Sequence, residues 1–241
     1  MRLQTACAII LPLFIYPPLN PYPTIGAIPL PPGYERAPAA PGSFAAWLRQ
    51  LPLKKDKTVH LYNGLPKRNQ GAQFAVLAVS AGDKDLQQCA DAVMRLRAEW
   101  LYSCRREADI DFADNGHTHY RLPRGAGRKE FDQYLEKVFS YCGSLSLSGQ
   151  LRAKPFSQVA AGDVLIYGGS PGHAMLVMDV AVNGEGRKLF LLSQSYMPAQ
   201  EIHVVVNPGS PSLSPWYAAD NGPNIETPEW TFSINQLKTW P

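Results

Sequence analysis

The pattern of apolar and polar positions predicts helices in the first half of the chain. Apolar residues recur every three or four positions after Asp83 and Asp85, which predicts a long helix from one of these aspartates to about Ser103. Asp85 and Gln88 have the spacing of a capping box, which favours a helix start there. Two further helices are predicted, over 44–51 after Ser43 and over 129–141 before Gly143 as a left-handed cap.

Short β-prone runs and chain reversals predict strands in the second half. An apolar run over 164–167 is followed by a glycine-rich loop, and His173 then opens a strand over 174–182 that is apolar except at Asp179. The Asn183–Gly184 turn reverses the chain into a strand over 188–193. Other strands are predicted over 59–62, 74–80, 110–112, 118–122 and 201–206, with a last helix or turn over 234–240. Strands that follow helices predict an α+β fold with helices packed on one antiparallel sheet.

His173 and Gln194 are the first candidate pair of functional residues. If the strands that carry them form a hairpin with aligned ends, the two side chains lie side by side at one edge. A side-chain amide that holds one ring nitrogen fixes the tautomer and orientation of a histidine, as a general base requires. The alternative is a histidine that only ends a strand.

The residues around this pair resemble those of known hydrolases. The sequence Gly162-Asp-Val, then Gly172-His173, an apolar strand and Ser193-Gln194-Ser-Tyr resemble the second half of the papain-like murein hydrolases of the NlpC/P60 and CHAP groups. The resemblance implies a papain-like core, in which His173 serves a cysteine nucleophile and Gln194 orients the ring. It further implies hydrolysis of an amide bond, with cell-wall peptide as a candidate substrate.

Three cysteines precede His173 outside the N-terminal leader, and Cys89 is the best candidate nucleophile. A helix N-terminus lowers the pKa of a thiol and a helix C-terminus opposes this. Cys89 lies four to six positions into the predicted long helix, whereas Cys104 and Cys142 lie at helix C-terminal ends. The alternative is an inert core residue. The same helix carries an apolar stripe of Leu86, Cys89, Val93, Leu96, Trp100 and Cys104.

The cysteine count leaves the disulfide pairing open. Without the leader three cysteines remain, an odd number that leaves at least one thiol free. Cys89 and Cys104 would lie ~22 Å apart on one straight helix, beyond the reach of a disulfide. Either of them with Cys142 remains possible. A catalytic Cys89 is expected to titrate well below about 8.5, the ordinary value of a free thiol.

A longer resemblance covers almost everything from Ile28 onward. It rests on four segments and is to an uncharacterised bacterial family of secreted proteins that is defined only as a domain of unknown function. This resemblance implies relatives but no chemistry. The segments are Ile28-Pro-Leu-Pro-Pro-Gly-Tyr, the helical stretch from Asp85 to Trp100, Ser195-Tyr-Met-Pro-Ala-Gln-Glu-Ile-His and Ser214-Pro-Trp-Tyr.

Five other residues are candidates for substrate contact. Arg95 is a candidate for carboxylate recognition, with a solvated helix face as the alternative. His203 is a candidate second histidine of the site, or a half-buried strand residue. Trp216 and Tyr217, with Trp230, lie among prolines and are candidates for an aromatic platform for a sugar. Packing of a loop cover is the alternative for these three rings.

The N-terminal region predicts export. Arg2 and about eleven mostly apolar residues over 6–16 suit a signal peptide, so residues 1–23 are expected to be a leader and the protein periplasmic or associated with the cell envelope. A proline-rich linker is expected over 24–42, followed by one globular domain over 43–241. No later segment approaches the ~20 apolar residues of a membrane helix.

Charge and motifs exclude several classes of protein. The net charge is only +3 and the basic residues are scattered, which argues against a nucleic-acid partner. No dinucleotide or nucleotide glycine motif is present, so no cofactor is expected. His117 and His119 alternate on one strand but lack a third ligand of suitable spacing, so no metal site is expected.

Two hypotheses follow from the sequence. The first is an exported cysteine hydrolase with Cys89 as nucleophile, His173 as general base and acid, and Gln194 as the orienting residue. The second is a non-catalytic envelope protein that binds glycan or protein through its aromatic loops.

Overall fold

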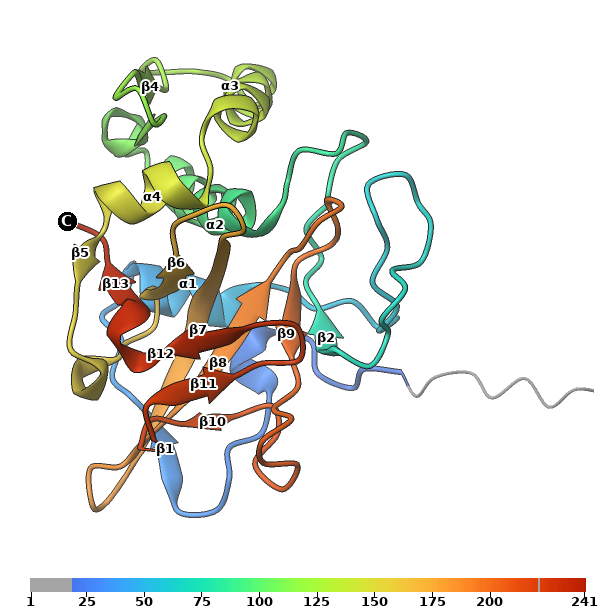
Figure 1. Ribbon diagram of the computed structural model, residues 1–241, viewed down its shortest axis with the longest axis vertical. Helices are drawn as coiled ribbons and strands as arrows, with labels where there is room; N and C mark the ends of the chain where they lie inside the picture. Colours follow the sequence, from blue (N-terminus) through green and yellow to red (C-terminus); the bar gives the residue numbers. More distant parts are fainter. Residues whose placement is uncertain (1–18, 221) are drawn as a thin grey trace, which may run out of the picture.

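The computed structural model describes residues 19–220 and 222–241, and it places helices against a large antiparallel sheet (Figure 1). The predicted leader over 1–23 lies largely outside the described residues, which begin at Leu19. Among the described residues, no helix is both long enough and apolar enough to cross a membrane.

Four α-helices are present in the described residues. Ser43 caps the first helix as predicted, because its Oγ accepts a hydrogen bond from the Ala46 N–H at 3.2 Å. Gly143 does not end a helix in the left-handed conformation, which corrects the prediction. It is instead the N-cap of a fourth helix that was not predicted, and its φ is −163°. The helices are α1 Phe44–Gln50, α2 Cys89–Ser103, α3 Arg128–Tyr141 and α4 Ser144–Gln150.

One antiparallel sheet organises the described chain, which bears out the α+β prediction. Seven of its nine strands follow the order β2-β9-β8-β7-β6-β13-β5, while β1 pairs with β7 and β10 pairs with β8. The bounds are β1 Tyr34–Arg36, β2 Gln73–Val76, β5 Arg152–Ala153, β6 Val164–Tyr167, β7 His173–Asn183, β8 Lys188–Gln194, β9 His203–Val205, β10 Tyr217–Ala218 and β13 Leu237–Thr239.

Two small hairpins accompany the sheet. The predicted strands around Asn115–Gly116 pair as β3 Asp111–Ala113 and β4 His119–Arg121. A second hairpin joins β11 Asn224–Glu226 to β12 Thr231–Ser233. The strand expected over 59–62 makes only isolated bridges, and the C-terminal helix or turn is a short 3-10 turn, Ile234–Gln236, that leads into β13. The other 3-10 turns are Ile25–Ala27, Glu107–Asp109 and Phe156–Gln158.

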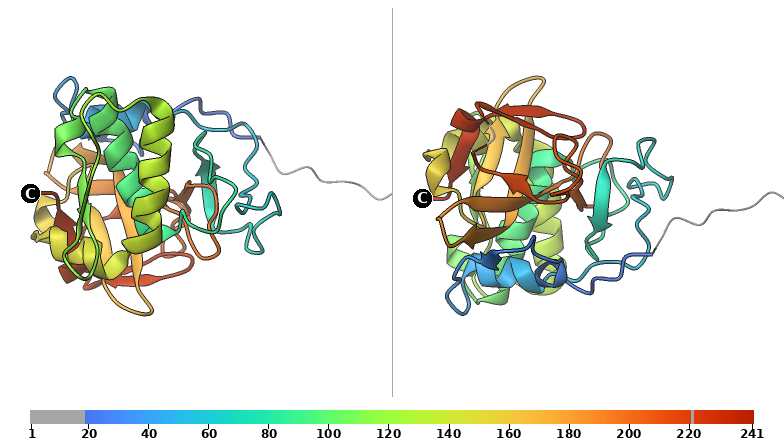
Figure 2. Two further views of the ribbon diagram at one scale, coloured as in Figure 1. Left: turned by 90° about the horizontal axis from the view of Figure 1, so that it is seen from above. Right: turned by 90° about the horizontal axis from the view of Figure 1, so that it is seen from below.

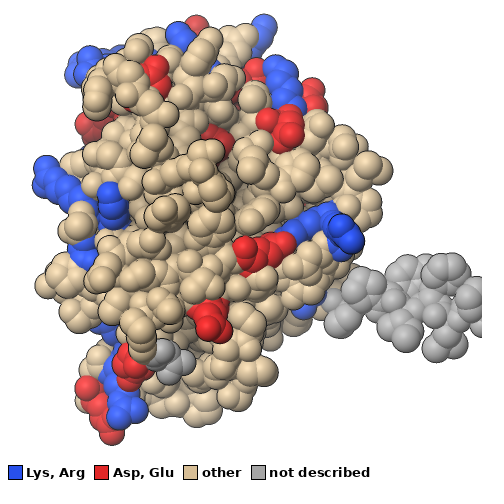
Figure 3. Space-filling model, viewed as in Figure 1, with Lys and Arg blue, Asp and Glu red and all other residues tan. Residues whose placement is uncertain are grey.

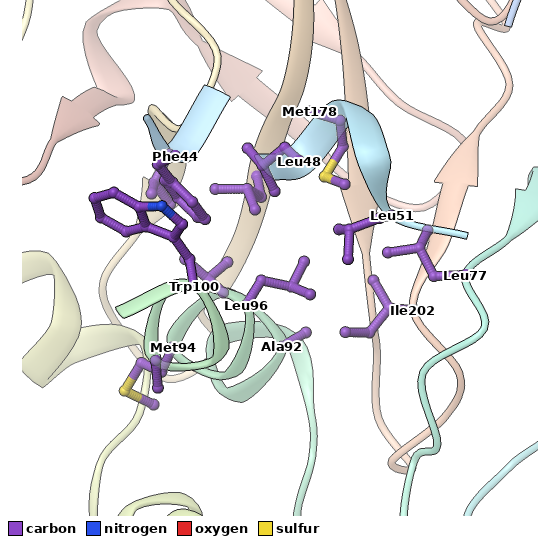
Figure 4. Close-up of a cluster of buried hydrophobic side chains, with 14 of the residues drawn as sticks. Phe44, Leu48, Leu51, Leu77, Ala92, Met94, Leu96, Trp100, Met178 and Ile202 are labelled. Carbon is purple, nitrogen blue, oxygen red and sulfur yellow. The ribbon is translucent and has the colours of Figure 1, made fainter. Parts of the chain in front are cut away.

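The sheet has an apolar core on each face. The larger core lies between the sheet and the helices, and the smaller one includes Phe190 of β8 and Phe232 of β12. Figure 2 shows α1 and the β11–β12 hairpin on opposite sides of the sheet. Figure 4 shows Leu48 of α1 and Leu96 of α2 directed toward Met178 of β7 within the larger core. The two faces explain why β7 and β8 are apolar on both sides.

The predicted proline-rich linker over 24–42 is part of the domain, which corrects that boundary. Ile25 and Ile28 are fully buried in the larger core. β1 pairs with the far end of β7, and Arg36 at the end of β1 forms an ion pair of 2.8 Å with the buried Asp179. The apolar residues between the prolines therefore bind this segment to the sheet instead of leaving it free.

Charged residues of both signs are interspersed on the face seen in Figure 3. Lys and Arg lie beside Asp and Glu near the edges of this view, and its centre carries few charges. Such a distribution lacks the single basic stripe of a nucleic-acid surface on this face.

Candidate functional site

Cys89 is the first residue of α2. The predicted helix start at Asp83 or Asp85 is wrong, because the chain there makes tight turns in which the Gln88 N–H donates to the Leu86 carbonyl. The Asp91 carboxylate accepts the Gln88 N–H at 3.0 Å and so begins the helix one residue before Cys89. The thiol therefore lies in the first turn, where the backbone N–H groups have no intrahelical partner.

α2 packs on β7, the strand that begins with His173. The backbone N–H of Ala174, the residue after His173, is close enough to the Cys89 sulfur to lower the pKa of its thiol. Burial acts in the opposite direction and is stronger, so it raises the pKa of Cys89 to about 11. Deprotonation of this thiol at neutral pH therefore needs a nearby base.

His173 lies at the open end of the β7–β8 hairpin, opposite the turn, as the sequence predicts. Its Nε2 is 2.9 Å from Oε1 of Gln194, the last residue of β8. The ring is 1% exposed and lies among the aromatic rings of Tyr196, Trp230 and Phe232, at centroid distances of 4.9, 5.3 and 5.8 Å. This burial lowers the pKa of His173 to about 4, so the ring is neutral at pH 7.

Cys89 and His173 are thus neighbours in the fold but both uncharged in the resting protein. No hydrogen bond joins the thiol to the ring in the part of the chain that the structure describes. A thiol with a raised pKa and an imidazole with a lowered pKa favour the neutral pair over a thiolate–imidazolium pair. The low thiol pKa expected from the sequence is therefore not found.

A cleft of about 300 Å³ opens at the Cys89 end of α2. Gly172 and Ser144 form part of its wall, and Met197, which is 65% exposed, lies at its rim. Met197 also borders a second cleft of about 470 Å³, whose lining includes Tyr196 and Lys67. Met197 is therefore shared by the cleft that Cys89 lines and by a second cleft that Cys89 does not line.

The residues predicted to contact substrate lie elsewhere. Trp216 is 1% exposed and donates its Nε1–H to the Pro29 carbonyl, and Tyr217 donates its hydroxyl to the Val206 carbonyl. Both rings pack in the core, which corrects the prediction of an aromatic platform. His203 is completely buried and contacts Gln194, so it faces no open cleft.

Arg95 lines another cavity, of about 360 Å³, that Cys89 does not line. Its guanidinium is held by Glu99 at 3.1 Å and by the Gln87 side-chain oxygen at 2.9 Å. This arrangement fits the alternative of local ion pairs on a helix face. Leu86 and Phe139 line both this cavity and the Cys89 cleft, so the two adjoin.

All three described cysteines are free thiols. Cys104 is exposed at the end of α2, while Cys142 is buried and lines the same cleft as Cys89. The two pairings that the sequence leaves open are therefore not formed among the described residues.

Two residues at the site carry no signal in the sequence, and the role of a third differs from the one that the sequence predicts. Glu229 accepts a hydrogen bond from Gln194 Nε2 at 2.7 Å, and Lys67 lies 2.5 Å from the same carboxylate. The sequence predicts Trp230 only as a loop aromatic for a sugar platform, yet its ring packs on His173. Glu229 and Lys67 lie in irregular segments, where no periodic pattern marks a functional residue.

Comparison with known proteins supports a family and no chemistry. Residues 26–121 and 113–239 match the family described as domain of unknown function 4846. These matches cover most of the chain, which therefore belongs to that family. Searches of curated proteins and of solved structures found no match.

Proposed function

We propose that this protein is an exported cysteine hydrolase with a papain-like core, and that it cleaves an amide bond in cell-wall peptide. The observation that carries the proposal is the meeting of three elements. α2 begins with Cys89, β7 begins beside it with His173, and β8 ends with Gln194 at 2.9 Å from the far nitrogen of that ring. A nucleophile, a base and a group that orients the base are the parts that acyl transfer requires.

In the proposed reaction the resting thiol gives up its proton only during attack. His173 Nε2 is occupied by Gln194, so Nδ1 is the ring nitrogen that remains to take the proton from the Cys89 sulfur. The sulfur bonds to the carbonyl carbon, and the unpaired N–H groups of the first turn of α2 stabilise the oxyanion. The imidazolium then protonates the leaving nitrogen as the C–N bond breaks. Water hydrolyses the thioester and restores the thiol.

Two clefts that share Met197, one of which Cys89 lines, support a peptide substrate. The larger one combines the apolar side chains of Leu61, Tyr196 and Met197 with polar and charged side chains such as Lys67. The smaller one is bordered by residues 169–172 of the β6–β7 loop. A peptide backbone lying across Met197 would present a carbonyl to the thiol. Export through the predicted leader is part of the proposal, and it would bring the protein to such a substrate in the periplasm or cell envelope.

The direct test is hydrolysis of purified muropeptides, followed by mass spectrometry. Cys89→Ala and His173→Ala are expected to lower the rate of amide cleavage at least about a thousandfold, the scale of losing a nucleophile or its base. Cys104→Ala is the matched control, because this thiol is exposed at the other end of the same helix. Full activity in folded Cys89→Ala would refute the proposal.

The binding-protein hypothesis loses its main support. That hypothesis depends on the Trp216 and Trp230 loops, and Trp216 is buried in the core. Trp230 is partly exposed but packs on His173, within the candidate catalytic site.

A further inference from the structure

We infer that Glu229 is a positioning residue that fixes the side-chain amide of Gln194, and through it the proton on Nε2 of His173. The inference rests on the proposed function and deepens it. It concerns which ring nitrogen is free to act as the base, a property that neither Cys89 nor His173 determines alone.

The first step concerns the orientation of the Gln194 amide. Its Nε2 lies 2.7 Å from Oε2 of Glu229. An ionised carboxylate has no hydrogen-bond donor, so the group that faces it must be the NH₂ of the amide. The amide oxygen then faces His173, and that contact is 2.9 Å. Because this oxygen only accepts, His173 must donate from Nε2, which leaves a lone pair on Nδ1.

His203 adds a second constraint of the same kind. Its Nδ1 lies 2.9 Å from the Glu201 carbonyl oxygen, which only accepts, so the proton is on Nδ1. Its Nε2 is therefore an acceptor, 3.3 Å from the Gln194 amide nitrogen. Burial lowers the pKa of His203 to about 3 and so keeps the ring neutral at pH 7. Both amide hydrogens of Gln194 thus have acceptors.

The Glu229 carboxylate is itself held in place. Lys67 Nζ lies 2.5 Å from Oε2, and Asn69 Nδ2 lies 3.3 Å from Oε1. Lys67 is 7% exposed, so the pair is largely removed from solvent. A carboxylate held on two sides cannot swing away to let the amide turn.

A reversed amide would disable the base. Turned by 180°, the Gln194 oxygen would face the Glu229 carboxylate, which is repulsive, and its NH₂ would face His173 Nε2. His173 would then have to accept at Nε2 and carry its proton on Nδ1. In that tautomer Nδ1 has no lone pair with which to take the thiol proton of Cys89.

The test measures the tautomer directly in the full-length protein. Long-range ¹H–¹⁵N spectra report which ring nitrogen of His173 carries the proton, with His173→Gln used to assign the signals. In the wild type we expect the Nε2–H form. In Glu229→Gln, which can present either an oxygen or an NH₂ to Gln194, we expect a mixture that includes the Nδ1–H form.

Activity gives a second readout. Glu229→Gln is expected to lower kcat about tenfold with little change in KM, since part of the population lacks the base. Lys67→Arg is the matched control, because it alters the same ion pair but keeps a positive charge beside the Glu229 carboxylate, and it should retain the Nε2–H form. If removal of one buried charge unfolds Glu229→Gln, the double variant Glu229→Gln with Lys67→Met removes both.

A folded Glu229 variant with only the Nε2–H form and the wild-type kcat would overturn the inference. This outcome is distinct from failure of the proposed function. If the wild type cleaves no wall peptide, the hydrolase proposal fails, whereas the tautomer spectra still decide whether Glu229 sets the proton on His173.

Discussion

A thiol at the first residue of a helix is subject to two opposing effects. The unpaired N–H groups of the first turn favour the thiolate, and burial favours the thiol. At Cys89 burial is the stronger effect, and the pKa rises to about 11. The position of Cys89 in α2 therefore does not by itself activate it, and the proposed mechanism needs His173 as a base during attack.

This balance predicts the pH dependence of Cys89 alkylation. Because only the thiolate reacts, a pKa near 11 leaves about one part in ten thousand reactive at pH 7. The rate constant with iodoacetamide should rise about tenfold per pH unit from 7 to 10. Mass spectrometry of the labelled peptide separates Cys89 from Cys104, whose exposed thiol serves as the internal comparison. A plateau for Cys89 below pH 8.5 would contradict the neutral resting pair.

At the scale of elements, the β6–β7 connection positions His173, the proposed base. The strand bounds of β6 and the start of β7 at His173 agree with the sequence, because apolar runs broken by glycine and proline are local signals. Gly172 precedes His173 and lies against the backbone of Gly169. A Cβ at Gly172 would be 2.5 Å from the Gly169 carbonyl oxygen, and a backbone atom cannot move aside cheaply.

We therefore expect Gly172→Ala to shift the start of β7. It should lower the free energy of unfolding by about 1–3 kcal/mol, as overpacking does, and reduce muropeptide cleavage. Gly184→Ala, in the turn at the other end of the hairpin, is the matched control, because a Cβ there meets no atom within 4 Å. Urea unfolding and the cleavage assay together check both variants. Equal stability of the two variants would show that the loop adapts.

At the scale of the whole molecule, the N-terminal segment completes the domain. Ile28 is fully buried, and the Pro29 carbonyl accepts the Trp216 Nε1–H at 2.7 Å. Two arginines from this region, Arg36 and Arg49, converge on the buried Asp179 at 2.8 and 2.7 Å. Such pairing explains why one charged residue is accommodated in the middle of β7.

Ile28→Ala should therefore destabilise the whole domain. Removal of a fully buried isoleucine side chain costs about 2–5 kcal/mol, measured as the free energy of unfolding in urea. Leu65→Ala is the control, because Leu65 is 60% exposed and the change should stay within about 0.5 kcal/mol. If residues 24–42 were a free linker, the two variants would be equally stable.

The sequence by itself determined the α+β class, the β6–β7–β8 strands and the meeting of His173 with Gln194. These features depend on alternation, turns and register, which act over a few residues or between neighbouring strands. The tertiary structure alone decided the start of α2, the burial of Trp216 and the pKa of Cys89. It also joined Gln194 to Glu229, 35 positions away, and Glu229 to Lys67, 162 positions away. Burial and pairing across such separations depend on how the elements pack, and no local pattern encodes them.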